Sequence, residues 1–260
     1  MDNLMIFEDD HYACAKRQGD RKHSSEILKL AGAKTDWRPD TPRPLRRTRS
    51  APRPEDKAKA DWWREHWQTV NGWRGDLYGN GRALAKFASD LRLNPETLQD
   101  LTGPAFDALA LVPAGFVPMN CKGPIREPRL GFVYRGAIKI RDPWPGSNIR
   151  FSMSGTPSRP WRSFWLGRPE LTITSVHVVE SESDAVALIE SDYERPFDAE
   201  GSVVIAVPGA SAWRPEWSPM LARKEIHLWP DNDTAGTQFT DRIGGDCHQQ
   251  AKSIIIHQLS

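Results

Sequence analysis

The chain has 260 residues, of which 38% are hydrophobic and 27% are charged, and its formal net charge at pH 7 is +1. This hydrophobic content suffices for one or two buried cores, and no apolar run reaches the roughly 18–20 residues of a membrane-spanning helix. A net charge so close to zero does not by itself indicate a nucleic-acid partner, so any such indication has to come from how the charges are distributed.

The three cysteines, Cys14, Cys121 and Cys247, are too widely spaced for a CxxC pair. The first residues also lack the basic start and the long apolar stretch of a signal peptide. We therefore expect a cytoplasmic protein with reduced thiols, no membrane partner and no four-cysteine zinc site.

Two segments are expected before the main folded region. Residues 1–36 hold a short apolar start and a short helix at 24–30. Residues 37–56 form a linker, since six arginines and five prolines lie between positions 38 and 54. Such a composition cannot build a packed core and predicts an extended tether. Its arginines also leave open a second interpretation, a non-specific clamp on phosphates.

The region 57–170 is expected to be a small mixed α+β subdomain. Its pattern predicts helices at 55–70, 82–91 and 95–101, with the chain broken by Gly72, Gly75, Gly79 and Gly81. Short β-like runs follow at 131–135 and 137–141, among many prolines, glycines and scattered basic residues.

From residue 171 the pattern becomes regular. Apolar, β-branched runs predict strands at 176–179, 203–207, 225–229 and 253–256, and helical segments are expected between them at 183–191, 213–223 and 234–250. Alternation of strands and helices is typical of an α/β fold with a parallel sheet covered by helices.

Three carboxylates follow two of the predicted strands. Glu180 comes directly after the first strand, and Asp231 and Asp233 follow the third after Pro230. Ligands of parallel sheets bind at the carboxyl ends of the strands, and carboxylates gathered there repel one another unless a cation is bound. The pattern therefore predicts a Mg²⁺ site. A simpler interpretation stays open, in which Asp231 and Asp233 cap the following helix.

A strand ending in Glu180, a turn at Pro208 and Gly209, and a DxDxxG motif from Asp231 occur here in that order. This order resembles the Toprim domain of primases, topoisomerases and some nucleases over residues 174–256. The resemblance implies a Toprim-type fold for residues 171–260, with Glu180, Asp231 and Asp233 as the catalytic and metal-binding residues.

The sequence upstream narrows the resemblance. Residues 136–142 and 164–167 look like the basic subdomain of bacteriophage-type primase–helicases, in which basic residues contact template or nucleotide. The matching positions here are Lys139 and Arg141, and the turn containing Gly209 and Ser211 is similar to a Gly-Ala-Ser turn of the same group. The resemblance implies that these four residues bind nucleic acid or nucleotide.

Several features depart from that family. Residues 7–14 are similar to the closing half of a primase zinc ribbon, but Arg17 stands where the second cysteine belongs, so no zinc is expected. Ser181 replaces the glycine that usually follows the Toprim glutamate, and no P-loop of a helicase occurs. The later acidic motif of the family is also absent.

The leading hypothesis is a Toprim primase-like enzyme that uses Mg²⁺ or Mn²⁺ to synthesise RNA primers on single-stranded DNA in phage or mobile-element replication. Ribonucleoside triphosphates and a separate replicative helicase would be its partners. The alternatives are a nucleic-acid-binding primase relic and a Toprim nuclease. Glu182 and Asp184 are second choices for the site and are expected rather to cap the helix that starts there, and His177 and His227 are expected to be structural.

Overall fold

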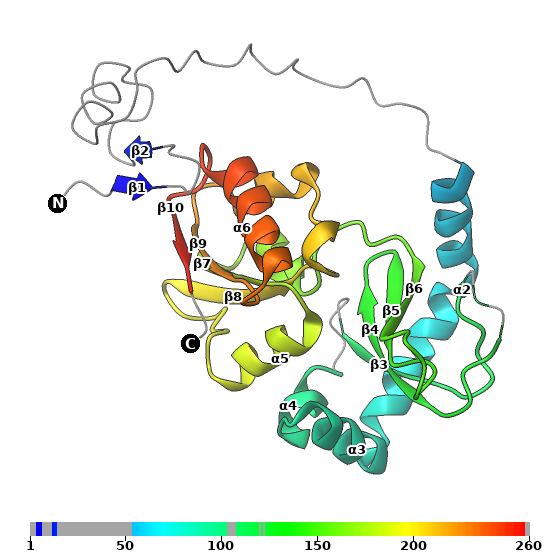
Figure 1. The fold of residues 1–260 in the computed structure, drawn as a ribbon. Helices are drawn as coiled ribbons and strands as arrows, with labels where there is room; N and C mark the ends of the chain where they lie inside the picture. The colour runs from blue at the N-terminus through cyan, green and yellow to red at the C-terminus, as the bar shows by residue number, and fades with distance from the viewer. Residues whose placement is uncertain are drawn as a thin grey trace. The chain divides into compact units, whose positions relative to one another are not determined.

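Figure 1 shows the computed structural model of the chain, which describes residues 4–6, 12–14, 54–102, 108–119, 121 and 123–257. The chain divides into two compact units, Met1–Ala51 and Pro52–Ser260. In the first unit, β1 (Leu4–Ile6) and β2 (Tyr12–Cys14) pair antiparallel. The helix predicted at 24–30, the rest of the zinc-ribbon-like segment and most of the linker lie outside the described residues.

The second unit begins with a long helix, α2 (Pro54–Tyr78), which runs through Gly72 and Gly75. The predicted break at these glycines is wrong. Val70 and Leu77 on the same helix are fully buried in the cores that the helix shares with the neighbouring antiparallel sheet. This burial outweighs the loss of about 1 kcal/mol that each glycine costs a helix relative to alanine.

Two shorter helices follow as predicted. Helix α3 (Gly81–Leu91) begins after Asn80, whose side chain accepts a hydrogen bond from the Ala83 backbone. Helix α4 (Pro95–Asp100) begins after Asn94 in the same way, with proline at its first position. Both caps satisfy backbone N–H groups that the first turn leaves without a partner.

An antiparallel sheet of four strands packs against α2. Its strands follow one another in space as they do in the sequence: β3 (Leu109–Val112), β4 (Arg129–Tyr134), β5 (Ala137–Arg141) and β6 (Phe151–Gly155). The strands predicted at 131–135 and 137–141 correspond to β4 and β5. Helices α2 to α4 and this sheet together form the mixed α+β region that precedes the second sheet.

The remaining strands form a parallel sheet in the order β10-β9-β7-β8. They are β7 (Ile173–Val179), β8 (Gly201–Ala206), β9 (Glu225–Trp229) and β10 (Ser253–Ile256). Helix α5 (Glu182–Glu190) joins β7 to β8, and α6 (Thr234–Cys247) joins β9 to β10. The helical segment expected at 213–223 is the 3-10 helix η3 (Pro215–Leu221), which contains Pro219, a residue without a backbone N–H.

The helices cover both faces of the parallel sheet (Figure 1). Val203 and Ile205 of β8 pack in one core with Phe239 of α6, whereas Val204 and Ala206 pack in another core with α5. This alternation is the period of two that side chains on a strand follow. The protein is therefore a mixed α/β protein with a four-stranded parallel sheet flanked by helices. None of the helices in the described part of the chain is long and apolar enough to cross a membrane.

The strand order creates a point at which the connections diverge. β7 and β9 are neighbours, but the chain leaves β7 for α5 on one face and leaves β9 for α6 on the other. In open α/β sheets, ligands bind in the crevice that such a divergence leaves at the carboxyl ends of the strands.

Candidate functional site

Glu180 lies at this point of divergence, directly after β7. Its side chain is only 6% exposed, and its Oε1 accepts a hydrogen bond of 2.9 Å from the backbone N–H of Asp231. The two residues are 51 positions apart in the sequence. The structure thus brings together the ends of β7 and β9, as the sequence predicts.

The electrostatics show which carboxylates surround Glu180. Burial raises its pKa against the opposite effect of the hydrogen bond from the Asp231 backbone, and the charges of Asp231, Asp233 and Asp184 raise it further. The pKa of Asp231 is also raised, by burial and by the charges of Asp184 and Asp233. Four carboxylates therefore share one edge of the sheet and repel one another.

Asp184 is the member of this group that the sequence makes only a second choice for the site, with helix capping as its expected role. It lies in the first turn of α5, where its side chain accepts a hydrogen bond of 2.5 Å from Ser181, the N-cap residue. Its position four residues after Glu180, one turn into the helix that follows β7, is the signal that could have placed it at the site.

Asp233 does cap a helix. It is the N-cap residue of α6, and its Oδ1 accepts a hydrogen bond of 2.8 Å from the backbone N–H of Gly236. The capping interpretation is thus confirmed for Asp233, and it occupies one carboxylate oxygen of this residue. Asp231 contributes its backbone oxygen to the same turn, since that oxygen accepts a hydrogen bond of 2.8 Å from the backbone N–H of Asp233.

The carboxylates at this edge of the sheet are of the ligand type that a magnesium ion prefers. Carboxylate oxygens are the hard donors that Mg²⁺ prefers, and a cation would relieve the repulsion that raises the pKa of Glu180 and Asp231. Among the residues that the structure describes, no group of three or more His, Cys, Asp or Glu side chains lies close enough together to hold a metal ion. Asp184, Asp231 and Asp233 are exposed, but hydrogen bonds from Ser181 and from the Gly236 backbone hold the carboxylates of Asp184 and Asp233.

Gly236 fixes the tight turn that carries Asp231. A Cβ atom at this position would lie 2.0 Å from the Asp231 backbone oxygen. We expect Gly236→Ala to destabilise the protein by about 3 kcal/mol or more, because the turn must shift to relieve the overlap. Gly245→Ala, in the same helix but with no atom within 4 Å, should instead stabilise it by about 1 kcal/mol. Urea denaturation of both variants measures the contrast, and equal effects would contradict it.

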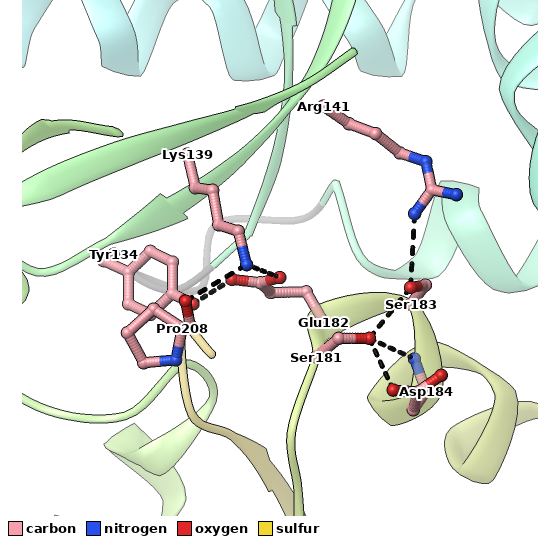
Figure 2. A network of polar contacts seen from close by, with 8 residues as sticks. All are labelled: Tyr134, Lys139, Arg141, Ser181, Glu182, Ser183, Asp184 and Pro208. Atoms are coloured by element: carbon pink, nitrogen blue, oxygen red, sulfur yellow. Dashed lines mark hydrogen bonds and ion pairs between the residues drawn. The ribbon is translucent and has the colours of Figure 1, made fainter. Parts of the chain in front are cut away.

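Lys139 is not free to bind a ligand in this structure. Figure 2 shows its ammonium group between α5 and the turn after β8, where Nζ donates to Glu182 Oε2 at 2.7 Å and to the Pro208 backbone oxygen at 3.3 Å. Tyr134 also hydrogen-bonds Glu182. Both charged side chains are buried, with 8% of Lys139 and 3% of Glu182 exposed. The expectation that Glu182 caps α5 is wrong, because its carboxylate points to the antiparallel sheet.

Arg141, two residues further along β5, is exposed. Its Nη1 lies 3.3 Å from Ser183 Oγ, which in turn lies 3.0 Å from Ser181 Oγ (Figure 2). This guanidinium group therefore reaches the first turn of α5, next to the carboxylates, and it remains accessible to an anion.

Gly209 and Ser211 belong to the turn after β8. Gly209 has a φ of 134°, and Ser211 lies in the short 3-10 helix η2 (Ala210–Ala212), where its backbone oxygen accepts a hydrogen bond of 3.0 Å from Arg242. Pro208, which precedes Gly209, accepts a hydrogen bond from Lys139 through its backbone oxygen. The turn thus contacts strand β5 through Pro208 and Lys139, whereas Ser211 contacts α6 through Arg242.

The predicted structural histidines form part of an aromatic stack. The rings of His177 and His227 are 4.5 Å apart, and His227 Nδ1 lies 2.9 Å from Nε2 of His257. His257 stacks on Trp229, whose indole N–H donates to His177 at 3.1 Å. These contacts support the structural role expected for both histidines.

This stack makes stability depend on pH. Burial, followed by the charges of His227 and His257, lowers the pKa of His177 to about 4, against a weaker opposite effect of Glu225. The unfolded protein then binds the extra proton between about pH 6.5 and pH 4. We expect the free energy of unfolding to fall in this range by up to about 1.4 kcal/mol per pH unit as the solution is acidified.

The variant His177→Gln keeps an acceptor for the Trp229 N–H but cannot take up the proton. Its unfolding free energy, measured by urea denaturation at several pH values, should fall less steeply than that of the wild type. An unchanged slope would assign the pH dependence to other groups. Glu180 and Asp231 act in the opposite direction, because a raised carboxyl pKa favours the folded state as pH falls.

Comparisons with protein-family models, with curated proteins and with solved structures find no match to this chain.

Proposed function

We propose that the protein is a cytoplasmic Toprim-type primase that joins ribonucleotides on a single-stranded DNA template. The observation that carries this proposal is the meeting of Glu180 and Asp231 at the point where β7 and β9 diverge. A glutamate after one strand and an Asp-x-Asp after its neighbour is the arrangement that the resemblance to Toprim proteins implies. The antiparallel sheet with Arg141 next to this edge supports a nucleic-acid substrate.

In this proposal Glu180, Asp231 and Asp233 hold Mg²⁺ or Mn²⁺, with Asp184 next to them. The bound ion supplies positive charge for the phosphate groups of the incoming nucleotide. Arg141 binds a phosphate of the nucleotide or template through its guanidinium group. In the reaction the 3′-hydroxyl of the primer gives up its proton to water as its oxygen forms a bond to the α-phosphorus. The bond between the α-phosphorus and the bridging oxygen of the β-phosphate breaks, and pyrophosphate leaves with its electron pair.

The buried position of Lys139 favours a second candidate function. A lysine that neutralises Glu182 has no free charge for a phosphate, which fits a primase relic that binds nucleic acid without catalysis. In this alternative a separate enzyme makes the primer, and this protein binds the single strand or a replication partner such as the helicase.

De novo primer synthesis on mixed-sequence single-stranded DNA, with labelled ribonucleotides and Mg²⁺ or Mn²⁺, tests the proposal. The double variant Asp231→Ala/Asp233→Ala is compared with Asp241→Ala, which removes an exposed carboxylate from α6 away from this turn. We expect product from the wild type and from Asp241→Ala, and none from the double variant.

Two results would contradict catalysis. Product from the double variant at the wild-type level would show that these carboxylates are not needed. Absence of product from every protein, with binding of single-stranded DNA intact, would support the binding relic instead.

A further inference from the structure

The face of the antiparallel sheet opposite α2 carries an exposed aromatic ring. The register pairs Phe151 of β6 with Arg141 of β5, so both side chains leave the same face of the sheet. Ile140, which precedes Arg141 on β5, points to the other face, where it is buried in the core with Val70 of α2. Phe151 is therefore not part of the core beneath α2, and 52% of it is exposed.

A cation lies beside this ring. Lys139 Nζ is 4.5 Å from the centroid of the Phe151 ring, within the range of a cation–π contact. The same ammonium group is held by Glu182 and Pro208. Because Lys139 is fixed by these partners, its contact with Phe151 also limits where the ring can lie.

The Phe151 ring and Arg141 are both connected to the first turn of α5, which follows Glu180. Lys139 connects Phe151 to Glu182 in the first turn of α5, and Arg141 contacts Ser183 in the same turn. One planar aromatic group is thus connected to this turn through Lys139, one exposed guanidinium group contacts it, and the carboxylate of Asp184 lies in it.

Each of these groups matches one part of a nucleotide. Aromatic side chains stack on nucleobases, guanidinium groups bind phosphates, and carboxylates hold the cation that accompanies a triphosphate. We propose that Phe151 is the stacking platform for a nucleobase at this site, with Arg141 holding a phosphate of the same chain or nucleotide. This inference rests on the proposed function, because it assumes that the site takes nucleic acid or nucleotides.

Binding measurements test the platform without relying on catalysis. Phe151→Ala is compared with Phe151→Tyr, which keeps an aromatic ring, and with Phe197→Ala, which removes an exposed phenylalanine from a different part of the unit. The probes are fluorescent oligothymidylate, an abasic oligonucleotide of equal length, ATP, and ribose triphosphate, each with Ca²⁺ to prevent turnover. Thermal melting checks that each variant is folded.

If a base of the single strand occupies the platform, Phe151→Ala should weaken binding of oligothymidylate about tenfold and leave the abasic strand unaffected. If the base of the nucleotide occupies it, the same loss should appear for ATP and not for ribose triphosphate. In both cases Phe151→Tyr and Phe197→Ala should bind as the wild type does. Arg141→Gln should weaken the probes with and without a base alike.

Wild-type affinity of Phe151→Ala for every probe would overturn the inference, as would an equal loss in Phe197→Ala or no binding of any probe by the wild type. Failure of primer synthesis alone would not overturn it, because the binding measurements do not depend on catalysis. A base-dependent loss in Phe151→Ala without synthesis by the wild type would retain the platform and reject the primase.

Discussion

Replacing Lys139 with methionine should destabilise the protein by about 3–5 kcal/mol, because the substitution leaves the buried carboxylate of Glu182 without its cation. Methionine retains most of the length and apolar surface of the lysine side chain, so the loss reflects the charge rather than a cavity. The free energy of unfolding from urea denaturation measures the effect. The Lys139→Met/Glu182→Gln double variant should recover much of the loss, since it removes both charges.

An exposed ion pair provides the matched control. Lys86 and Asp90 on α3 are also in close contact, at 2.6 Å, but each side chain is about half exposed, at 52% and 53%. Lys86→Met should therefore change the stability by less than about 0.5 kcal/mol. A cost for Lys139→Met as small as that for Lys86→Met would show that the buried pair contributes little.

Under the proposed function, Glu180→Gln is expected to lower activity strongly while stabilising the protein in the absence of metal. Burial and three neighbouring carboxylates disfavour the charge on Glu180, and glutamine keeps an oxygen that accepts the Asp231 N–H. Without the charge, Mg²⁺ should be held more weakly and transition-state stabilisation reduced, which we expect to lower primer synthesis by about 10²–10³-fold.

Thermal melting with and without Mg²⁺ separates the two effects. The wild type should melt at a higher temperature when Mg²⁺ is added, because an ion that binds only the folded state stabilises it. Glu180→Gln should melt higher than the wild type without Mg²⁺ and respond less to its addition. The control Glu200→Gln removes an exposed carboxylate and should behave as the wild type. Equal responses to Mg²⁺ in all three proteins would contradict a metal site at Glu180.

The strands and helices after residue 171 could be predicted because each one buries side chains that its own sequence period reveals. Val203 to Val207 is a continuous apolar run, and such a run predicts a strand buried on both faces. The break predicted at Gly72 is wrong because it considers only the low helix propensity of glycine. The contact of α2 with the antiparallel sheet, which stabilises the helix, is not visible in the local sequence.

The candidate site was predictable only in part, for a similar reason. That Glu180 and Asp231 meet could be predicted, since Glu180 directly follows one strand of a parallel sheet and Asp231 follows another after a single proline. The pairing of Lys139 with Glu182 joins residues 43 positions apart, one on strand β5 of the antiparallel sheet and one on helix α5. The sequence shows that both residues are charged. Only the packing of α5 against the antiparallel sheet shows that they form an ion pair.

The ion pair between Lys139 of the antiparallel sheet and Glu182 of helix α5 also has an evolutionary consequence. Tyr134 and Lys139 come from the antiparallel sheet, whereas Glu182 comes from the helix after β7, so each half of the unit supplies a group that the other half needs. Recombination that joined residues 171–260 to an unrelated upstream segment would bury a carboxylate with no cation. The two halves are therefore expected to be inherited together, and a change at position 139 or 182 to be tolerated only when the other position changes as well.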